Sequence, residues 1–155
     1  MFFALGLIAS LSMPQAPTCR TASSRIETTV ADKVRELKGH EYCQFRLYNH
    51  THDIDGDKRD DFLMVFSVEG INGSMNATRQ FLVAFPSGSS WKPSVVEVGS
   101  RGVRVVVGLE VEDRRVVLPT AERKEGDALC CLSGSGTLVF RLEGGKLVAS
   151  NAGVK

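Results

Sequence analysis

The sequence predicts an α+β fold in which one N-terminal amphipathic helix packs on a mainly antiparallel β-sheet or sandwich of about eight strands. Two observations carry this prediction: one segment of helical periodicity comes first, and a long series of short strand-like segments follows it. No fixed-period repeat is visible, which argues against a whole propeller. The chain has 155 residues, 43% of them hydrophobic, and this suffices for one domain with a real core, expected over residues 24–155.

The helix is expected over about residues 25–38. Ser24 and Glu27 fit a capping box at its start. Apolar side chains then recur at helical spacing, and Gly39 is a plausible stop; they are Ile26, Val30, Val34 and Leu37. One face of this helix should dock on the sheet.

Strand-like patterns begin after Gly39, where apolar and polar residues alternate over 43–48. The apolar run Phe62–Val68 is expected to be a central strand, and Phe81–Phe85 a similar one that ends at Pro86. Turn residues at 112–115 and at Gly144-Gly145 predict two hairpins. The remaining strands are expected at 95–98, 103–107, 109–112, 116–118, 128–132, 137–142 and 146–149.

The first 12 residues form a short apolar segment that ends in small and polar residues, which is typical of a secretory signal peptide. Residues 13–23 are expected to be a flexible leader. No other stretch approaches 18 apolar residues, so we expect a secreted or periplasmic protein without a membrane span. Lipoprotein anchoring at Cys19 is the weaker alternative, because Ala16-Pro-Thr-Cys19 is a poor lipobox.

The charge pattern argues against nucleic acid as a partner. The formal net charge is +1, and no basic cluster is interleaved with aromatic residues. Catalytic signatures are also absent from the sequence: there is no G-x-S-x-G elbow, H-E-x-x-H pair, Walker loop or G-x-G-x-x-G motif. A non-catalytic structural or binding domain is therefore the leading interpretation.

The strongest chemical signal is a run of five aspartates within nine residues, from Asp53 to Asp61. Carboxylates this dense repel one another unless a cation or several donors compensate. Calcium takes six to eight oxygen ligands, and EF-hand-type loops supply them at positions 1, 3, 5, 7 and 9. These positions are occupied by Asp53, Asp55, Asp57, the Arg59 carbonyl and Asp61.

The loop is not an EF-hand. Lys58 stands where an EF-hand has glycine, and Met64 stands where the bidentate glutamate belongs. A solvated acidic turn, held by hydrogen bonds from its own backbone, is the alternative interpretation. Asp60 and His52 are expected to lie next to the ligands without binding the ion themselves. Magnesium fits less well, because it prefers few carboxylates and several waters.

Two further groups suggest other functions. His50 and His52 precede the loop, so a small exported hydrolase that uses these imidazoles or the metal is the first alternative. An envelope protein-interaction module is the second, because Trp91 lies in a Ser/Pro loop and can contact a protein or glycan partner. Acceptor sequons at Asn49, Asn72 and Asn76 would carry glycans only in a eukaryotic host.

The four cysteines suggest disulfides in an exported chain, with three connectivities open; they are Cys19, Cys43, Cys130 and Cys131. A bond between the adjacent Cys130 and Cys131 should be strained. On a strand their side chains would point to opposite faces, so each is expected to meet a separate partner or one to stay free. Zinc is disfavoured because the pair lacks C-x₂₋₄-C spacing.

Two motifs together carry a resemblance. The segment Asp53–Val65 resembles the calcium loop and strand of integrin-type (FG-GAP/VCBS) repeats, in which Gly normally stands at the position of Lys58. With Gly126–Cys131 and the closing hairpin it also resembles small exported bacterial proteins of unknown function that end in a Cys-Cys motif. That family has Pro after its Cys pair, where this chain has Leu132. The resemblance covers roughly residues 40–149 and implies export and a β-rich domain, but no reaction.

Overall fold

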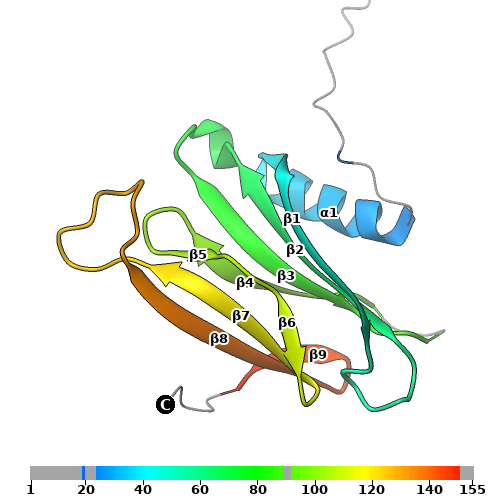
Figure 1. Ribbon diagram of the computed structural model, residues 1–155. Coiled ribbons are helices and arrows are strands. Elements are labelled where there is room, and N and C mark those ends of the chain that lie inside the picture. Colours follow the sequence, from blue (N-terminus) through cyan, green and yellow to red (C-terminus); the bar gives the residue numbers. More distant parts are fainter. Residues whose placement is uncertain (1–18, 20–23, 89–91, 151–155) are drawn as a thin grey trace, which may run out of the picture.

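The computed structural model describes Cys19 and residues 24–88 and 92–150, without the side chains of 49–51. One helix is followed by an antiparallel β-structure (Figure 1). The elements are α1 (Ser24–Leu37), β1 (His40–His52), β2 (Asp61–Glu69), the 3-10 turn η1 (Ile71–Gly73), β3 (Thr78–Phe85), β4 (Ser94–Ser100), β5 (Arg104–Val106), β6 (Glu110–Glu112), β7 (Arg115–Glu122), β8 (Gly134–Glu143) and β9 (Lys146–Ala149).

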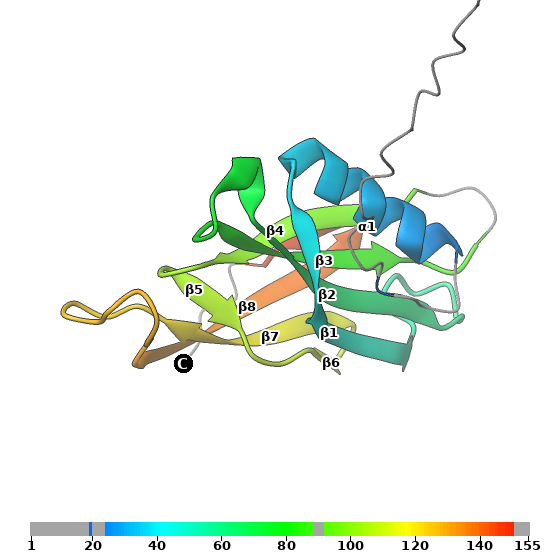
Figure 2. The same cartoon turned by 90° about the horizontal axis from the view of Figure 1, so that it is seen from above.

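The nine strands form one sheet in the order β1-β2-β3-β4-β5-β7-β8-β9, with β6 paired to β7. Every pairing is antiparallel, and most strands neighbour the next one along the chain. The sheet folds over, so that β1 approaches β6 and β4 approaches β9 (Figure 2). At the second approach the Leu147 N–H donates to Ser94 Oγ at 2.9 Å.

The larger apolar core lies between the two halves of the folded sheet. Alternate residues of each strand point into it, as the period of two requires. Leu63 and Val65 enter from β2, Leu82 from β3, Leu118 from β7 and Phe140 from β8. This inner core holds the two halves together.

A second apolar cluster covers the opposite face of β2 and β3, on the side of the helix (Figure 2). Ile26 and Val30 of α1 are buried there against Phe66 and Val83. The helix spans Ser24–Leu37, within one residue of the range that the sequence predicts. Gly39 follows, where a Cβ would lie 2.5 Å from the Glu69 carbonyl oxygen, so the turn into β1 requires glycine.

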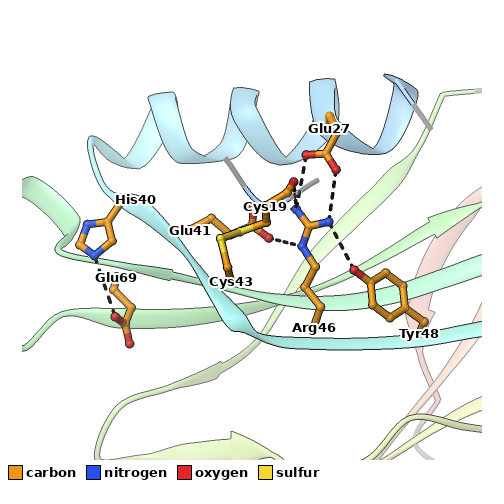
Figure 3. The surroundings of a disulfide bond; sticks show 8 residues. All are labelled: Cys19, Glu27, His40, Glu41, Cys43, Arg46, Tyr48 and Glu69. Carbon is orange, nitrogen blue, oxygen red and sulfur yellow. Dashed lines mark hydrogen bonds and ion pairs between the residues drawn. A yellow bond between two sulfur atoms is a disulfide. The ribbon is translucent and has the colours of Figure 1, made fainter. Parts of the chain in front are cut away.

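A disulfide between Cys19 and Cys43 ties the segment before α1 to β1 (Figure 3). Beside it the Arg46 guanidinium is almost fully buried, and its Nη2 donates to the Cys19 carbonyl oxygen at 3.0 Å. Because this bond and the disulfide hold the same residue, the start of the described domain is fixed to the sheet at two points.

Two carboxylates compensate the buried charge of Arg46. Glu41 accepts from Nε at 2.5 Å and from Nη2 at 2.7 Å, while Glu27 of α1 accepts from Nη1 at 3.3 Å (Figure 3). Burial alone would lower the pKa of Arg46, but these hydrogen bonds outweigh it and raise that pKa. Breaking such a pair by removing one partner leaves an uncompensated charge, so the cluster locks α1 onto β1.

One predicted strand is wrong. Residues 128–132 lie in the connection between β7 and β8, where the Cys131 N–H donates to the Ala128 carbonyl oxygen at 3.0 Å and closes a turn. Cys130 and Cys131 are disulfide-bonded to each other, and no described cysteine is free. The expectation of separate partners fails because it assumed strand geometry, which holds neighbouring side chains apart.

The other strand predictions are confirmed, and β1, β3, β4, β7 and β8 are each at least three residues longer than expected. Both hairpin turns fall where the sequence places them: Asp113 and Arg114 join β6 to β7 with positive φ, and Gly144-Gly145 joins β8 to β9. The expected signal peptide, most of the leader and Trp91 lie outside the described residues. Within those residues, no helix is long and apolar enough to cross a membrane.

Substitution of Leu82 tests whether the inner core stabilises the fold. Its side chain is fully buried between the sheet halves, so Leu82→Ala should lower the free energy of unfolding by about 2–5 kcal/mol. The matched change Val107→Ala removes a side chain that is 58% exposed and should shift it by about 0.5 kcal/mol or less. Urea denaturation measures both, and equal effects would contradict this assignment of the core.

Candidate functional site

The acidic segment connects β1 to β2 at one end of the folded sheet, near the turns β6–β7 and β8–β9 (Figure 1). Its last aspartate, Asp61, is the first residue of β2 and pairs with His52 of β1. The segment between them therefore closes a hairpin whose register is set by the central strand.

Asp61 anchors this connection. Its side chain is 2% exposed, and Oδ2 accepts the Ile54 N–H at 2.8 Å while Oδ1 accepts the Ser87 N–H at 2.7 Å. Ser87 follows β3, so one carboxylate joins the loop to two neighbouring strands. Ile54 is itself buried and belongs to the inner core, which holds the middle of the loop down.

The loop backbone wraps around Asp53. Gly56 donates its N–H to Asp53 Oδ1 at 2.5 Å, and Lys58 donates to Oδ2 at 3.1 Å. Gly56 has φ +91° and Lys58 φ +68°, so both take the left-handed conformation. That conformation is free for glycine but carries a modest cost for lysine.

Three of the predicted carboxylates converge. Asp53, Asp55 and Asp61 each offer an oxygen, and these three atoms all lie within 4.8 Å of one another. Two oxygens that contact one Ca²⁺ at about 2.3–2.6 Å lie at most about 4.6–5.2 Å apart. The separation of the three oxygens is thus compatible with a single calcium ion.

Asp57 is not part of this group. Its Oδ1 accepts the Arg59 N–H at 2.8 Å, and its other oxygen lies 3.9 Å from Arg59 Nε. The N–H of Asp57 donates to Asp55 Oδ1 at 3.0 Å. The structure therefore gives this aspartate a role in the loop backbone, and its coordination of a metal, like that of the Arg59 carbonyl, stays a prediction.

A cation from elsewhere in the chain reaches the cluster. Arg114, in the turn between β6 and β7, has Nη2 3.9 Å from Asp53 Oδ2. A Cβ at Gly56 would lie 2.9 Å from Arg114 Nη1, so the guanidinium rests against the loop at its glycine. Arg114 and Ser87 are site residues that sequence reasoning missed, because nothing local marks a pairing across 26 or more residues.

The carboxylates differ in their proton affinity. Desolvation works to raise the pKa of Asp53, but the N–H groups of Gly56 and Lys58 and the charge of Arg114 outweigh it and lower that pKa. Desolvation also raises the pKa of Asp55, to which the negative charges of Asp61, Asp57 and Asp53 add, against the hydrogen bond from the Asp57 N–H. Asp55 is thus the carboxylate with the least internal compensation.

The other predicted site residues stay apart from this group. Asp60 and His52 are exposed, and neither belongs to the group of metal-competent side chains in the described residues. The side chain of His50 and all of Trp91 lie outside the described residues. The cysteine pair Cys19–Cys43 lies beside Glu41, but its sulfurs are bonded to each other.

The chain was compared with protein-family models, curated proteins and solved structures, and none of the three comparisons found a match. What the site does must therefore be argued from its own geometry.

Asp61 tests the anchoring role. In Asp61→Asn one oxygen becomes an amide nitrogen that faces a backbone N–H, so the protein without calcium should lose about 1–3 kcal/mol of stability. Asp60→Asn removes an exposed charge from the neighbouring position and should change stability by about 0.5 kcal/mol or less. Urea unfolding in excess EDTA compares them. An Asp61→Asn protein as stable as wild type would refute the anchor.

The opposite pKa shifts give a second prediction. In calcium-free protein, carbon-13 NMR of the side-chain carboxyls should show Asp53 titrating below, and Asp55 above, the usual aspartate pKa of about 3.9. Ionised Asp53 then stabilises the fold above the unfolded pKa, and this is lost as pH falls through its lowered value. Ionised Asp55 opposes folding, and this loss of stability develops as pH rises from the unfolded pKa to its raised folded value. Coincident midpoints would contradict the geometry.

Proposed function

We propose that this protein is a secreted calcium-binding domain without catalytic activity, in which the ion fixes the β1–β2 connection to the start of the central strand. The observation that carries the proposal is the convergence of oxygens from Asp53, Asp55 and Asp61 within 4.8 Å of one another. Hard carboxylate oxygens suit calcium, and Asp61 is already held by two backbone N–H donors.

Calcium rather than magnesium follows from the donor set. Magnesium keeps several waters and usually takes one or two carboxylates in a strict octahedron, whereas calcium accepts many oxygens in flexible geometry. Three carboxylates on one short loop supply more negative charge than magnesium sites normally use. Backbone carbonyls and water would complete the shell.

Arg114 competes with the ion for Asp53. The guanidinium lies 3.9 Å from an Asp53 oxygen that would bind the ion. If the guanidinium stays in place, its positive charge repels calcium and weakens binding, so tight binding requires the guanidinium to move. Arg114 has a side-chain exposure of 64%, which allows it to turn into solvent. We expect a weak site, suited to the millimolar calcium found outside cells.

Two disulfides support the proposal that the protein is exported, since such bonds persist in oxidising compartments. The bond from Cys19 to Cys43 also engages the sulfur that a lipid anchor would need, which favours the secreted or periplasmic form. We further propose that this domain binds a protein or glycan partner and does not catalyse a reaction.

Calorimetric titration of Ca²⁺ into EDTA-treated protein tests the site. Wild type should bind one ion, and at 100 times the dissociation constant calcium should add about 2.7 kcal/mol of stability. Asp55→Asn should abolish the binding heat without unfolding the protein, because Asp55 is exposed and its side chain bonds only one backbone N–H. Asp60→Asn makes the same charge change outside the cluster and should bind as wild type does.

A third variant, Arg114→Gln, removes the competing cation and should bind calcium more tightly than wild type. No binding heat with wild type, together with a melting temperature that is unaffected by calcium or EDTA, would reject the proposal. Equal loss in Asp55→Asn and Asp60→Asn would show nonspecific attraction to an acidic loop.

A further inference from the structure

A cavity of about 370 Å³ opens at the end of the folded sheet remote from the acidic loop. Its lining comes from the start of β1, the end of β2, the start of β3 and the end of β4, with the β7–β8 connection as a further wall. Figure 1 shows that connection at the same end as the β4–β5 turn and η1. The volume lies within the range of small-molecule sites, about 300–1,000 Å³.

The floor of the cavity interrupts the apolar pattern of the inner core. Ser67 follows Leu63 and Val65 at the strand period, and Gln80 precedes Leu82 in the same way, so both polar side chains occupy core positions. The two residues pair across β2 and β3. They are 2% and 4% exposed and both line the cavity.

These two side chains have spare hydrogen-bonding capacity. Gln80 Oε1 accepts the Val106 N–H at 2.7 Å, which leaves the amide nitrogen as a donor without a partner among the described residues. The Ser67 hydroxyl likewise has no hydrogen-bond partner within that part of the chain. Neither atom is sealed from solvent, because the buried polar side-chain atom that lacks a partner among the described residues is Ser87 Oγ. Polar side-chain atoms are normally hydrogen-bonded, so these two groups, which line the cavity, point to a ligand or ordered water inside it.

Apolar side chains also line the cavity, beside the charged Glu69 and Arg101. Phe45 and Tyr42 come from β1, and Leu129 and Cys130 come from the β7–β8 connection. Tyr42 and Leu129 are among the exposed large hydrophobic side chains. Gly102 allows the close approach of Leu129, because a Cβ there would lie 2.5 Å from Leu129 Cδ2. A lining that combines aromatic and aliphatic side chains suits a flat apolar ring.

The wall that carries Leu129 is preorganised. Asp127 Oδ2 accepts the N–H groups of Lys124 and Ser133, each at 2.8 Å, and so ties the two ends of the loop together. The Cys130–Cys131 disulfide and the turn closed by the Cys131 N–H constrain the tip. A loop fixed in this way loses little freedom on binding, which favours affinity.

We propose that the cavity binds an uncharged amphipathic small molecule, whose apolar ring lies between Tyr42 and Leu129 and whose carbonyl or hydroxyl oxygen bonds to Ser67 and Gln80. Neutrality follows from the charged lining, where Glu69 and Arg101 contribute one charge of each sign. The site is separate from the acidic loop, and its occupation does not depend on calcium.

The test uses prodan, a neutral naphthalene with a ketone and a dimethylamino group, and follows its fluorescence with full-length protein in EDTA. Saturable binding with a blue-shifted emission is expected. Ser67→Ala removes the polar anchor without adding bulk, and Leu129→Lys places a charge at the mouth; each should weaken binding about tenfold or more. Val148→Lys makes the same kind of change at an exposed position that is not in the lining and should bind as wild type does.

Amide chemical-shift changes locate the probe. They should centre on Ser67, Gln80 and the β7–β8 connection, and nitrogen-15 spectra of each variant confirm that it is folded. The proposal is overturned if folded wild type shows no saturable binding, if Ser67→Ala and Leu129→Lys bind as tightly as Val148→Lys, or if the shifts map to another surface. Because EDTA is present throughout, failure of the calcium proposal leaves this result unaffected.

Discussion

The burial of β2 on both faces is the constraint on which the rest of the structure depends. Met64 and Phe66 point toward the helix, Leu63 and Val65 toward the folded-over half, and all four are at most 1% exposed. Each such side chain contributes about 1.5–3 kcal/mol when fully buried. A strand with apolar residues on both sides cannot sit in an open sheet with one wet face. Helix α1 covers one side, and the sheet folds over to cover the other.

Both ends of β2 replace apolar with polar side chains, and the two replacements differ in their hydrogen bonding. Asp61 enters the strand with both carboxylate oxygens bonded to backbone N–H groups, so its burial is compensated within the fold. The hydroxyl of Ser67, near the other end, lines the cavity and has no hydrogen-bond partner in the described part of the chain. A satisfied polar group specifies local structure, whereas an unsatisfied one keeps capacity for a molecule from outside. One strand thus carries an internal anchor at one end and, in our proposal, a ligand-binding position near the other.

The fold was largely predictable where signals are local. The helix follows from residues three and four apart, and the Gly144-Gly145 turn from two adjacent glycines, so neither depends on distant contacts. The failure at 128–132 has the opposite cause. Its apolar letters suit a strand, but the carboxylate of Asp127 joins the backbone at Lys124 and Ser133 and closes the segment as a loop. The folding-over of the sheet could not be predicted from the sequence either, because it arises from contacts between strands far apart in sequence.

The candidate site shows the same division. Spacing alone identified the acidic loop, because the oxygens of Asp53 and Asp55 are brought together by the hairpin that contains them. Spacing also places Asp57 among the ligands, and this stays a prediction: its Oδ1 accepts the Arg59 N–H, and its Oδ2 lies 3.9 Å from Arg59 Nε. The guanidinium of Arg114 comes from a turn more than 50 residues away, so no local sequence pattern could predict its contact with Asp53. Since that cation lies against Asp53, the proposed binding of calcium depends less on the number of aspartates than on whether the ion displaces the guanidinium of Arg114.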